Sequence, residues 1–302
     1  MSALKKLLKN KPKIPSSLVF LGIITILAFY FLQDIQFSSF AINKNTFFSL
    51  FKNNQLKQLP SDQFDFTLLE ESASPDESAS ANWWLNSGAK VLNQQGIIKT
   101  VQGSLSPDDR WFKAYLRSTP IDTDAGSHPQ NIFRLVNKNN LQNIRQQAYF
   151  KINKTIISNS PNRNESNGIL FFNRYYDGDN LYYTGIRVDG TAIIKKKING
   201  TYFTMKQNEV FTGEYQKNTV PNLIPEQKWI GLKSEVENLN FKEVSIKLFI
   251  DKEANGKWEQ IAEATDDGKS YNGSSFINAG HPGIRTDFMD IEFKDYKIEI
   301  LK

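Results

Sequence analysis

The stretch from Ile169 to Met205 reads ILFFNRYYDGDNLYYTGIRVDGTAIIKKKINGTYFTM, and its short apolar runs are separated by turn-forming residues. Asp177-Gly178-Asp179-Asn180 stands after the first run, Asp189-Gly190 after the second and Asn199-Gly200 after the third. Asn-Gly and Asp-Gly pairs are preferred in two-residue hairpin turns because both central residues there need a positive φ. The stretch therefore predicts a four-stranded antiparallel meander, with strands over 169–176, 181–188, 191–197 and 201–205.

The same pattern of β-branched and aromatic runs continues on both sides of this meander. Further strands are expected over 64–69, 132–136, 148–152, 229–236, 244–251, 258–262, 284–288 and 296–301. The Ser-, Ala- and acid-rich segment 70–81 reads as a solvated loop, and no amphipathic helix of three turns is evident after residue 60. Ten or more antiparallel strands over ~220 residues, with no fixed repeat, predict an all-β, two-sheet jelly-roll sandwich.

An apolar segment near the N-terminus has the length of a membrane span. Ile14 to Leu32 (IPSSLVFLGIITILAFYFL) contains no charged residue, and at 1.5 Å per residue it would cover roughly 28 Å of a ~30 Å hydrocarbon core. Lysines precede the segment and Asp34 is the first charge after it, so the N-terminus should remain in the cytoplasm. A cleaved signal peptide and a buried helix of a soluble domain are the alternatives.

This interpretation divides the chain into four parts. We expect a basic cytoplasmic tail over 1–13, one transmembrane helix over 14–33, a stalk over 34–60 and the β-sandwich over 61–302. The lipid bilayer would then be a partner through Ile14 to Leu32. The protein is expected to be a single-pass membrane protein with an extracytoplasmic C-terminal domain.

The charge distribution argues against a nucleic-acid surface on the sandwich. Five of the 37 basic residues are lysines within the first thirteen positions, and the 32 that remain equal the 32 acidic residues. A nucleic-acid-binding domain would need an excess of positive charge on its folded part. The chain also has no cysteine, which excludes disulfides, Cys-ligated metals and thiol catalysis.

Several segments of the second half resemble the concanavalin A-like lectin/glucanase superfamily, which includes laminin-G-like and family-16-like jelly rolls. They follow one another in this order: Asn167–Arg174 (NGILFFNR), Asp179–Tyr183 (DNLYY), Trp229–Lys233 (WIGLK), Val244–Asp251, Gly280, Gly283–Asp287 (GIRTD) and Met289–Phe293. The similarity covers roughly residues 165–302, and we place its start near Trp83. It implies a sandwich in which one sheet is concave and carries polysaccharide sites, although a fold by itself does not establish an activity.

Two groups of residues around the first hairpin are the candidate site. Arg174, Tyr176, Tyr183 and Arg187 have side chains suited to binding a glycan, and strand alternation places Tyr183 and Arg187 on one face. Asp177, Asp179 and Asn180 offer oxygen ligands for calcium, although they also suffice as a turn and no EF-hand is present. The run Lys195-Lys196-Lys197 reads as a solvated strand edge.

No complete catalytic motif is found. The resemblance implies that a retaining glucanase with this fold would carry the motif E-x-D-x-E on one strand. The carboxylates at alternate positions of this motif share a face of the sheet. Here the matching segment is Phe288-Met289-Asp290-Ile291-Glu292, so the nucleophile's position holds Phe, and the two acids read as solvent-facing. The leading hypothesis is therefore a membrane-anchored domain that binds carbohydrate or another surface ligand without catalysis. An anchored glycoside hydrolase or polysaccharide lyase, and a ligand-free structural envelope protein, are the alternatives.

Overall fold

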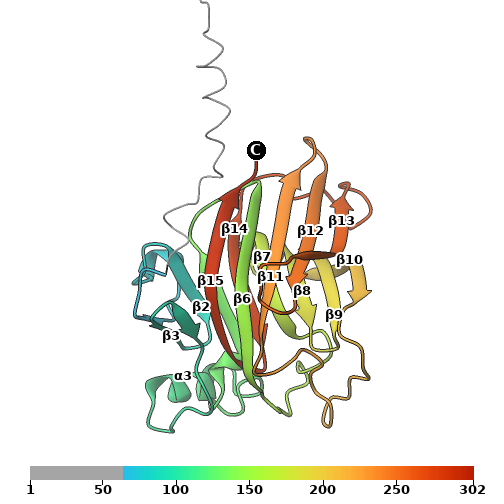
Figure 1. The fold of residues 1–302 in the computed structure, drawn as a ribbon. Coiled ribbons are helices and arrows are strands. Elements are labelled where there is room, and N and C mark those ends of the chain that lie inside the picture. Colours follow the sequence, from blue (N-terminus) through green and yellow to red (C-terminus); the bar gives the residue numbers. More distant parts are fainter. Residues whose placement is uncertain (1–63) are drawn as a thin grey trace, which may run out of the picture. The chain divides into compact units, whose positions relative to one another are not determined.

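The computed structural model describes residues 64–302, which form two antiparallel β-sheets packed face to face (Figure 1). The predicted all-β, two-sheet sandwich is thereby confirmed. The predicted cytoplasmic tail, transmembrane helix and stalk lie outside the described residues and stay predictions. Across 64–302, none of the helices has both the length and the apolar character that crossing a bilayer requires.

The larger sheet has eight strands, and the smaller one has seven. In spatial order the eight are β1 (Leu68–Glu70), β3 (Lys90–Gln94), β4 (Ile97–Lys99), β15 (Met289–Ile300), β6 (Ile144–Thr155), β11 (Trp229–Asn238), β12 (Val244–Asp251) and β13 (Glu259–Asp266). The seven are β10 (Thr201–Glu209), β9 (Thr191–Ile198), β8 (Asn180–Arg187), β7 (Gly168–Asp177), β14 (His281–Asp287), β5 (Ile132–Asn137) and β2 (Trp83–Ser87). The helices are α3 (Arg110–Ser118) and two 3-10 turns, η2 (Pro75–Glu77) and η3 (Pro129–Asn131).

The predicted four-stranded meander is confirmed as β7, β8, β9 and β10, which pair in chain order at one side of the seven-stranded sheet. Strands β2, β3 and β4 and the first half of β6 were not predicted. Their sequences (WWLNS, KVLNQ and IIK for the first three) are short or interrupted by polar residues. Helix α3 was not predicted either, because its nine residues make fewer than three turns.

The main hydrophobic core lies between the two sheets. Its largest fully buried side chains include Trp83, Phe133, Phe150, Phe171 and Phe293. Alternate residues of each strand face this core, so the residues between them face outward. On the seven-stranded sheet the outward residues form a second, smaller apolar cluster, made of Trp84, Val136, Leu170, Phe172, Leu181, Tyr183 and Ile193.

A β-bulge interrupts the alternation of β7. Arg174 has a φ of +50°, and the pairing of β7 with β8 shifts between Asn173 and Asp177. Asn173 therefore points into the sandwich, where its amide bonds Thr184, while Tyr175 packs on the outward cluster. Gly280 accommodates the bulge, because a Cβ there would lie 2.7 Å from the Arg174 backbone. Asn173 and Tyr175 therefore face opposite sides of the sheet, although strict alternation along a strand would place them on one face.

The predicted solvated edge at Lys195–Lys197 is wrong for Lys196. Strand β10 covers the edge of β9, and the Lys196 side chain is fully buried against Asp266 of β13, with 2.9 Å between the charged atoms. Lys196 faces opposite to its two neighbours, as alternation predicts, and this direction points it into the core.

Candidate functional site: the outer face of the seven-stranded sheet

Charged and aromatic side chains from five strands gather on the outer face of the seven-stranded sheet. Arg285 of β14 lies directly opposite Arg134 of β5 on one side and Leu170 of β7 on the other. Tyr183 of β8 pairs with Lys195 of β9. Directly opposed residues in a sheet project to the same face. Strand pairing alone therefore brings together residues that are far apart in the sequence.

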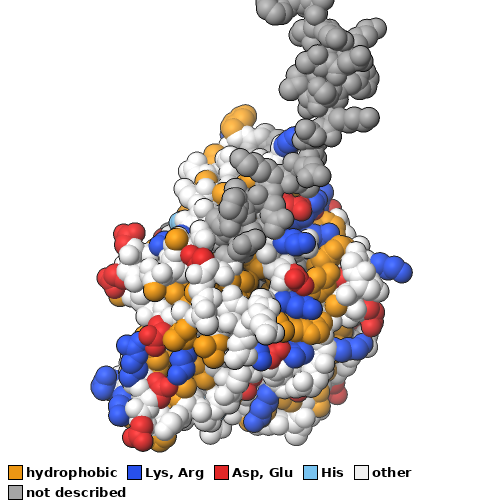
Figure 2. All heavy atoms as spheres, turned by 60° about the vertical axis from the view of Figure 1, so that its left-hand side comes forward, with side chains coloured by type: hydrophobic (Ala, Val, Ile, Leu, Met, Phe, Trp, Pro, Cys, Tyr) orange, Lys and Arg blue, Asp and Glu red, His pale blue; other side chains and the backbone are white. Residues whose placement is uncertain are grey.

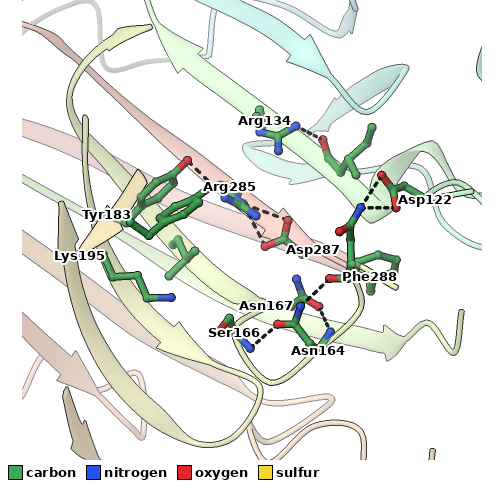
Figure 3. A pocket seen from close by; sticks show the side chains of 14 residues that line it. Asp122, Arg134, Asn164, Ser166, Asn167, Tyr183, Lys195, Arg285, Asp287 and Phe288 are labelled. Carbon is green, nitrogen blue, oxygen red and sulfur yellow. Dashed lines mark hydrogen bonds and ion pairs between the residues drawn. The ribbon is translucent and has the colours of Figure 1, made fainter. Parts of the chain in front are cut away.

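These side chains line a basic pocket with a volume of about 400 Å³ (Figure 3). Its lining consists of Asp122, Ile132, Arg134, Asn162, Asn164, Ser166, Asn167, Leu170, Tyr183, Lys195, Tyr202, Arg285, Asp287 and Phe288. The sheet forms the floor, and the loop that carries Asn164, Ser166 and Asn167 borders one side (Figure 3). The volume is within the range of small-molecule sites.

The Arg285 guanidinium is held by two other residues of this pocket, Asp287 and Tyr183. Its Nε contacts both carboxylate oxygens of Asp287 at 3.0 and 3.1 Å, and an Nη donates to the Tyr183 hydroxyl at 3.3 Å. Within residues 64–302, Arg134 in contrast donates to the Ser87 hydroxyl and the Ile132 carbonyl, at 3.3 and 3.4 Å. These long distances mark weak hydrogen bonds.

Two tyrosines beside Arg285 have pKa values that differ in direction. Burial raises the pKa of Tyr183 to about 12. Burial would also raise the pKa of Tyr202. The positive charges of Arg285 and Lys197 outweigh this effect, so the pKa of the Tyr202 phenol is lowered. The two rings lie 5.9 Å apart. An anionic phenol is stabilised next to a guanidinium because opposite charges attract.

A second hollow of about 480 Å³, the aromatic pocket, lies at the other end of the same face. It is lined by Pro75, Asp76, Trp84, Val136, Lys138, Tyr175, Tyr176, Asp177 and His281. Leu170 of the basic pocket pairs with Arg285, and Tyr175 of the aromatic pocket pairs with His281, four positions away on β14, which corresponds to roughly 14 Å along a strand. Phe172 lies between them and stacks on Tyr175, at 5.2 Å between ring centroids.

The four predicted ligand-binding residues occupy different environments. Tyr183 lines the basic pocket and Tyr176 lines the aromatic pocket. Arg187 is buried and forms an ion pair with Asp189 at 2.7 Å. Because β8 runs unbroken from Asn180 to Arg187, Tyr183 and Arg187 point to the same face.

Arg174, the fourth predicted residue, lies inside one end of the sandwich. Its guanidinium donates to the Gln142 carbonyl at 2.9 Å, to Asn238 at 2.8 Å and to the Phe276 carbonyl. Only 2% of the residue is exposed, and it lines neither pocket. The bulge directs this side chain inward, where it ties β7 to the loop before β14.

The predicted calcium ligands form the turn between β7 and β8. Asp177 accepts hydrogen bonds from the Asp179 amide at 2.7 Å and from the Asn180 side chain at 3.0 Å. Asp179 pairs with Lys197 at 3.0 Å. Within residues 64–302, no group of three or more His, Asp or Glu side chains is arranged to hold a metal ion. Calcium binding at this turn stays a prediction.

Asp290 and Glu292 are buried, which corrects the prediction that they face solvent. Asp290 accepts from the Gly103 amide and the Gln130 side chain, each at 2.8 Å. Glu292 lies between Lys99 at 3.2 Å and Lys151 at 2.7 Å. Both acids belong to β15 of the eight-stranded sheet, away from the two pockets. The Asp290 carboxylate holds the loop at Gly103, and the Glu292 carboxylate joins neighbouring strands through the two lysines. The alternation of residues along a strand does not reveal these partners, because they are distant in the sequence.

A chain of three polar side chains connects the loop before α3 to η3. The Ser104 hydroxyl lies 2.9 Å from His128 Nε2, and His128 Nδ1 lies 2.9 Å from Asp124. These are the residue types of a hydrolytic triad. The Gly103 and Leu105 amides beside Ser104 already donate to Asp290 and to the Ser127 carbonyl, so they are not free to bind an oxyanion. We interpret this chain as a support for the loop.

Acidic and basic side chains are interspersed over the face shown in Figure 2, without a continuous basic area. This mixture agrees with the formal neutrality of the chain after residue 13. The described part of the chain therefore gives no indication of a nucleic-acid surface on this side.

Comparisons with known proteins give similarities in structure only. No protein-family model matches the sequence, and a search of curated proteins found no match. Carbohydrate-binding module 66 from Bacillus subtilis is 11% identical, with a TM-score of 0.44 over 72% of this chain and 94% of that chain. A Bacillus subtilis protein of unknown function with a galectin-like fold is 14% identical, with a TM-score of 0.40 over 72% and 89%. The VIP36 exoplasmic/lumenal domain, solved with Ca²⁺ and mannose, is 10% identical, with a TM-score of 0.42 over 81% and 92%. Since all three TM-scores are below 0.5, we base no argument about ligand or activity on them.

Proposed function

We propose that residues 64–302 form a concanavalin A-like, jelly-roll domain that binds carbohydrate on the outer face of its seven-stranded sheet. One observation carries this proposal: the face has a hydrogen-bonding pocket at one end and an aromatic pocket at the other. A saccharide needs both, because its hydroxyl groups require polar partners and the flat faces of its rings pack on aromatic side chains.

We further propose that this domain is held outside the cytoplasm by the apolar segment Ile14 to Leu32. The support is the sequence alone, which has an uncharged segment of spanning length preceded by five lysines. A glycan-binding domain on such an anchor would attach the cell envelope, or the cell surface, to saccharides around it.

A glycan array probed with the full chain in a mild detergent tests the binding proposal. We expect binding to a restricted set of glycans, weakened about threefold to tenfold in Tyr175→Ala and in Tyr176→Ala, because each change removes an aromatic surface from the aromatic pocket. Phe241→Ala is the matched control, since Phe241 is 76% exposed and lies outside both pockets. Equal binding by all three variants, or binding to no glycan, would refute the proposal.

A second candidate function, a carbohydrate-active enzyme, is favoured by the tyrosine pair next to Arg285. Tyr202 has a lowered pKa and Tyr183 a raised one, and such a pair can serve as proton acceptor and proton donor in an elimination. Glycans that bind should be incubated with the protein while new double bonds and new reducing ends are measured. Turnover that disappears in Tyr202→Phe would establish this second function, whereas binding without turnover supports the first.

A further inference from the structure

The two arginines of the basic pocket bring two positive charges to neighbouring strands. Arg134 and Arg285 are directly opposed on adjacent strands, and their side chains project to the same face. Like charges in this position repel each other. Asp287 contacts Arg285, but residues 64–302 provide no carboxylate within 4 Å of Arg134. A bound anion would offset this repulsion.

Lys195 adds a third positive charge on the same side of the sheet. Its ammonium forms no ion pair within the described range 64–302, and its side chain points into the basic pocket (Figure 3). Burial lowers the pKa of Lys195, and the nearby positive charges of Arg187 and Arg285 lower it further. These effects disfavour the charged amine, and a negative partner in the pocket would offset them.

The acidic residues of the pocket do not supply that partner. Both oxygens of Asp287 are engaged by Arg285, and Asp122 accepts hydrogen bonds from Ser160 at 2.6 Å and from Asn162 at 3.0 Å. The pocket lining therefore contains three cationic side chains and two carboxylates whose hydrogen bonds are already made. Tyr202 lies at the same end of the face, 48% exposed, and offers a ring surface beside these charges.

From this arrangement we propose that the basic pocket binds an acidic saccharide, with a carboxylate or sulfate group held between Arg134, Arg285 and Lys195. The guanidinium groups of the arginines offer planar arrays of donors that match the two oxygens of such a group. The ring of the saccharide would lie over Tyr202, which is the exposed aromatic ring at this end of the face, and its neighbouring residues would extend toward the aromatic pocket. This inference rests on the proposed glycan-binding function and specifies its ligand class.

Titration calorimetry with the full chain in a mild detergent tests the inference. The probes are trigalacturonic acid, its fully methyl-esterified form and a sulfated trisaccharide of the same length. We expect the acid or the sulfate to bind and the ester to bind at least tenfold more weakly, because esterification removes the charge and leaves the sugar intact. Binding of the acidic probe should weaken as the salt concentration rises.

Arg134→Gln and Lys195→Gln should each weaken binding of the acidic probe by roughly tenfold. Lys228→Gln is the matched control, because Lys228 is exposed and lies outside both pockets. All variants keep the lysines of the first thirteen residues, so any attraction of the probe to that segment is the same in each. Lys195→Gln should also be about as thermally stable as the wild type, since Lys195 is only partly buried and forms no ion pair within residues 64–302.

The possible outcomes distinguish the acidic-saccharide site from the more general proposal that the domain binds glycans. Preference for the charged probes, lost in Arg134→Gln and Lys195→Gln, supports the acidic-saccharide site. Equal binding of acid and ester, or unchanged binding in both variants, overturns the inference while glycan binding stands. Binding of no acidic probe, together with a glycan array that shows no binding at all, overturns both.

Discussion

Replacing Asp266 by Ala is expected to lower the free energy of unfolding by about 3–5 kcal/mol, because the buried ammonium of Lys196 would lose its counter-charge. The two side chains are fully buried and 2.9 Å apart. The ammonium also donates to the Gly273 and Ser274 carbonyls, at 2.8 and 3.0 Å, and Asp266 accepts from the Tyr182 hydroxyl at 2.6 Å. Urea denaturation followed by tryptophan fluorescence measures the loss.

The double variant Lys196→Met with Asp266→Asn is the control for this effect. It removes both charges, and the Asn side chain still accepts the hydrogen bond from Tyr182, so most of the lost stability should return. Lys247→Gln provides a comparison at an exposed ion pair with Glu263, 3.8 Å apart, where we expect a change of less than about 1 kcal/mol. A loss below about 1 kcal/mol in Asp266→Ala would contradict the buried ion pair.

Trp83→Ala should also destabilise the protein by about 3–5 kcal/mol, because it leaves a cavity between the two sheets. Trp83 is fully buried, stacks on Phe64 with 4.8 Å between ring centroids, and meets the Tyr296 ring edge-on at 5.0 Å. The change therefore breaks an aromatic contact between β2, β15 and the segment before β1. The same denaturation experiment measures it.

Trp258→Ala is the matched control for the loss of an indole. Trp258 is partly exposed, and its ring lies 5.8 Å from Tyr149 and under the Lys233 ammonium at 4.5 Å. We expect less than about half the destabilisation of Trp83→Ala, since little buried volume is lost. Equal losses in the two variants would show that Trp83 is not a core residue.

The strands that sequence reasoning identified are those closed by local turn chemistry. Asp189-Gly190 and Asn199-Gly200 specify hairpins within a few residues, and β7 to β10 follow from them. The pairing of β6 with β15 joins residues about 140 positions apart, and no local pattern reports such a contact. The bulge at Arg174 escaped prediction for a similar reason, because an arginine with a positive φ carries no recognisable sequence signal.

The candidate site was predictable only where its residues lie in one hairpin. Tyr183 and Tyr176 were selected from the β7–β8 region, and the structure places each in a pocket. Arg134, Lys195 and Arg285 come from three strands distant in sequence, and only the sheet order brings them together. Arg285 and Asp287 do stand two positions apart in GIRTD, a spacing that places them on one face of a strand. Apart from the selection of Tyr183, that spacing is the sequence signal for the basic pocket.

Hydroxyl-radical footprinting of the full chain, with and without trigalacturonic acid, tests the central claim most directly. The claim is that a saccharide covers the outer face of the seven-stranded sheet. Tyr202 and Tyr176, which are 48% and 38% exposed, should be oxidised less in the presence of the sugar, and Phe241 should be oxidised equally in both samples. Protection of Phe241 or Trp258, with Tyr202 and Tyr176 unchanged, would place the ligand elsewhere and contradict the account.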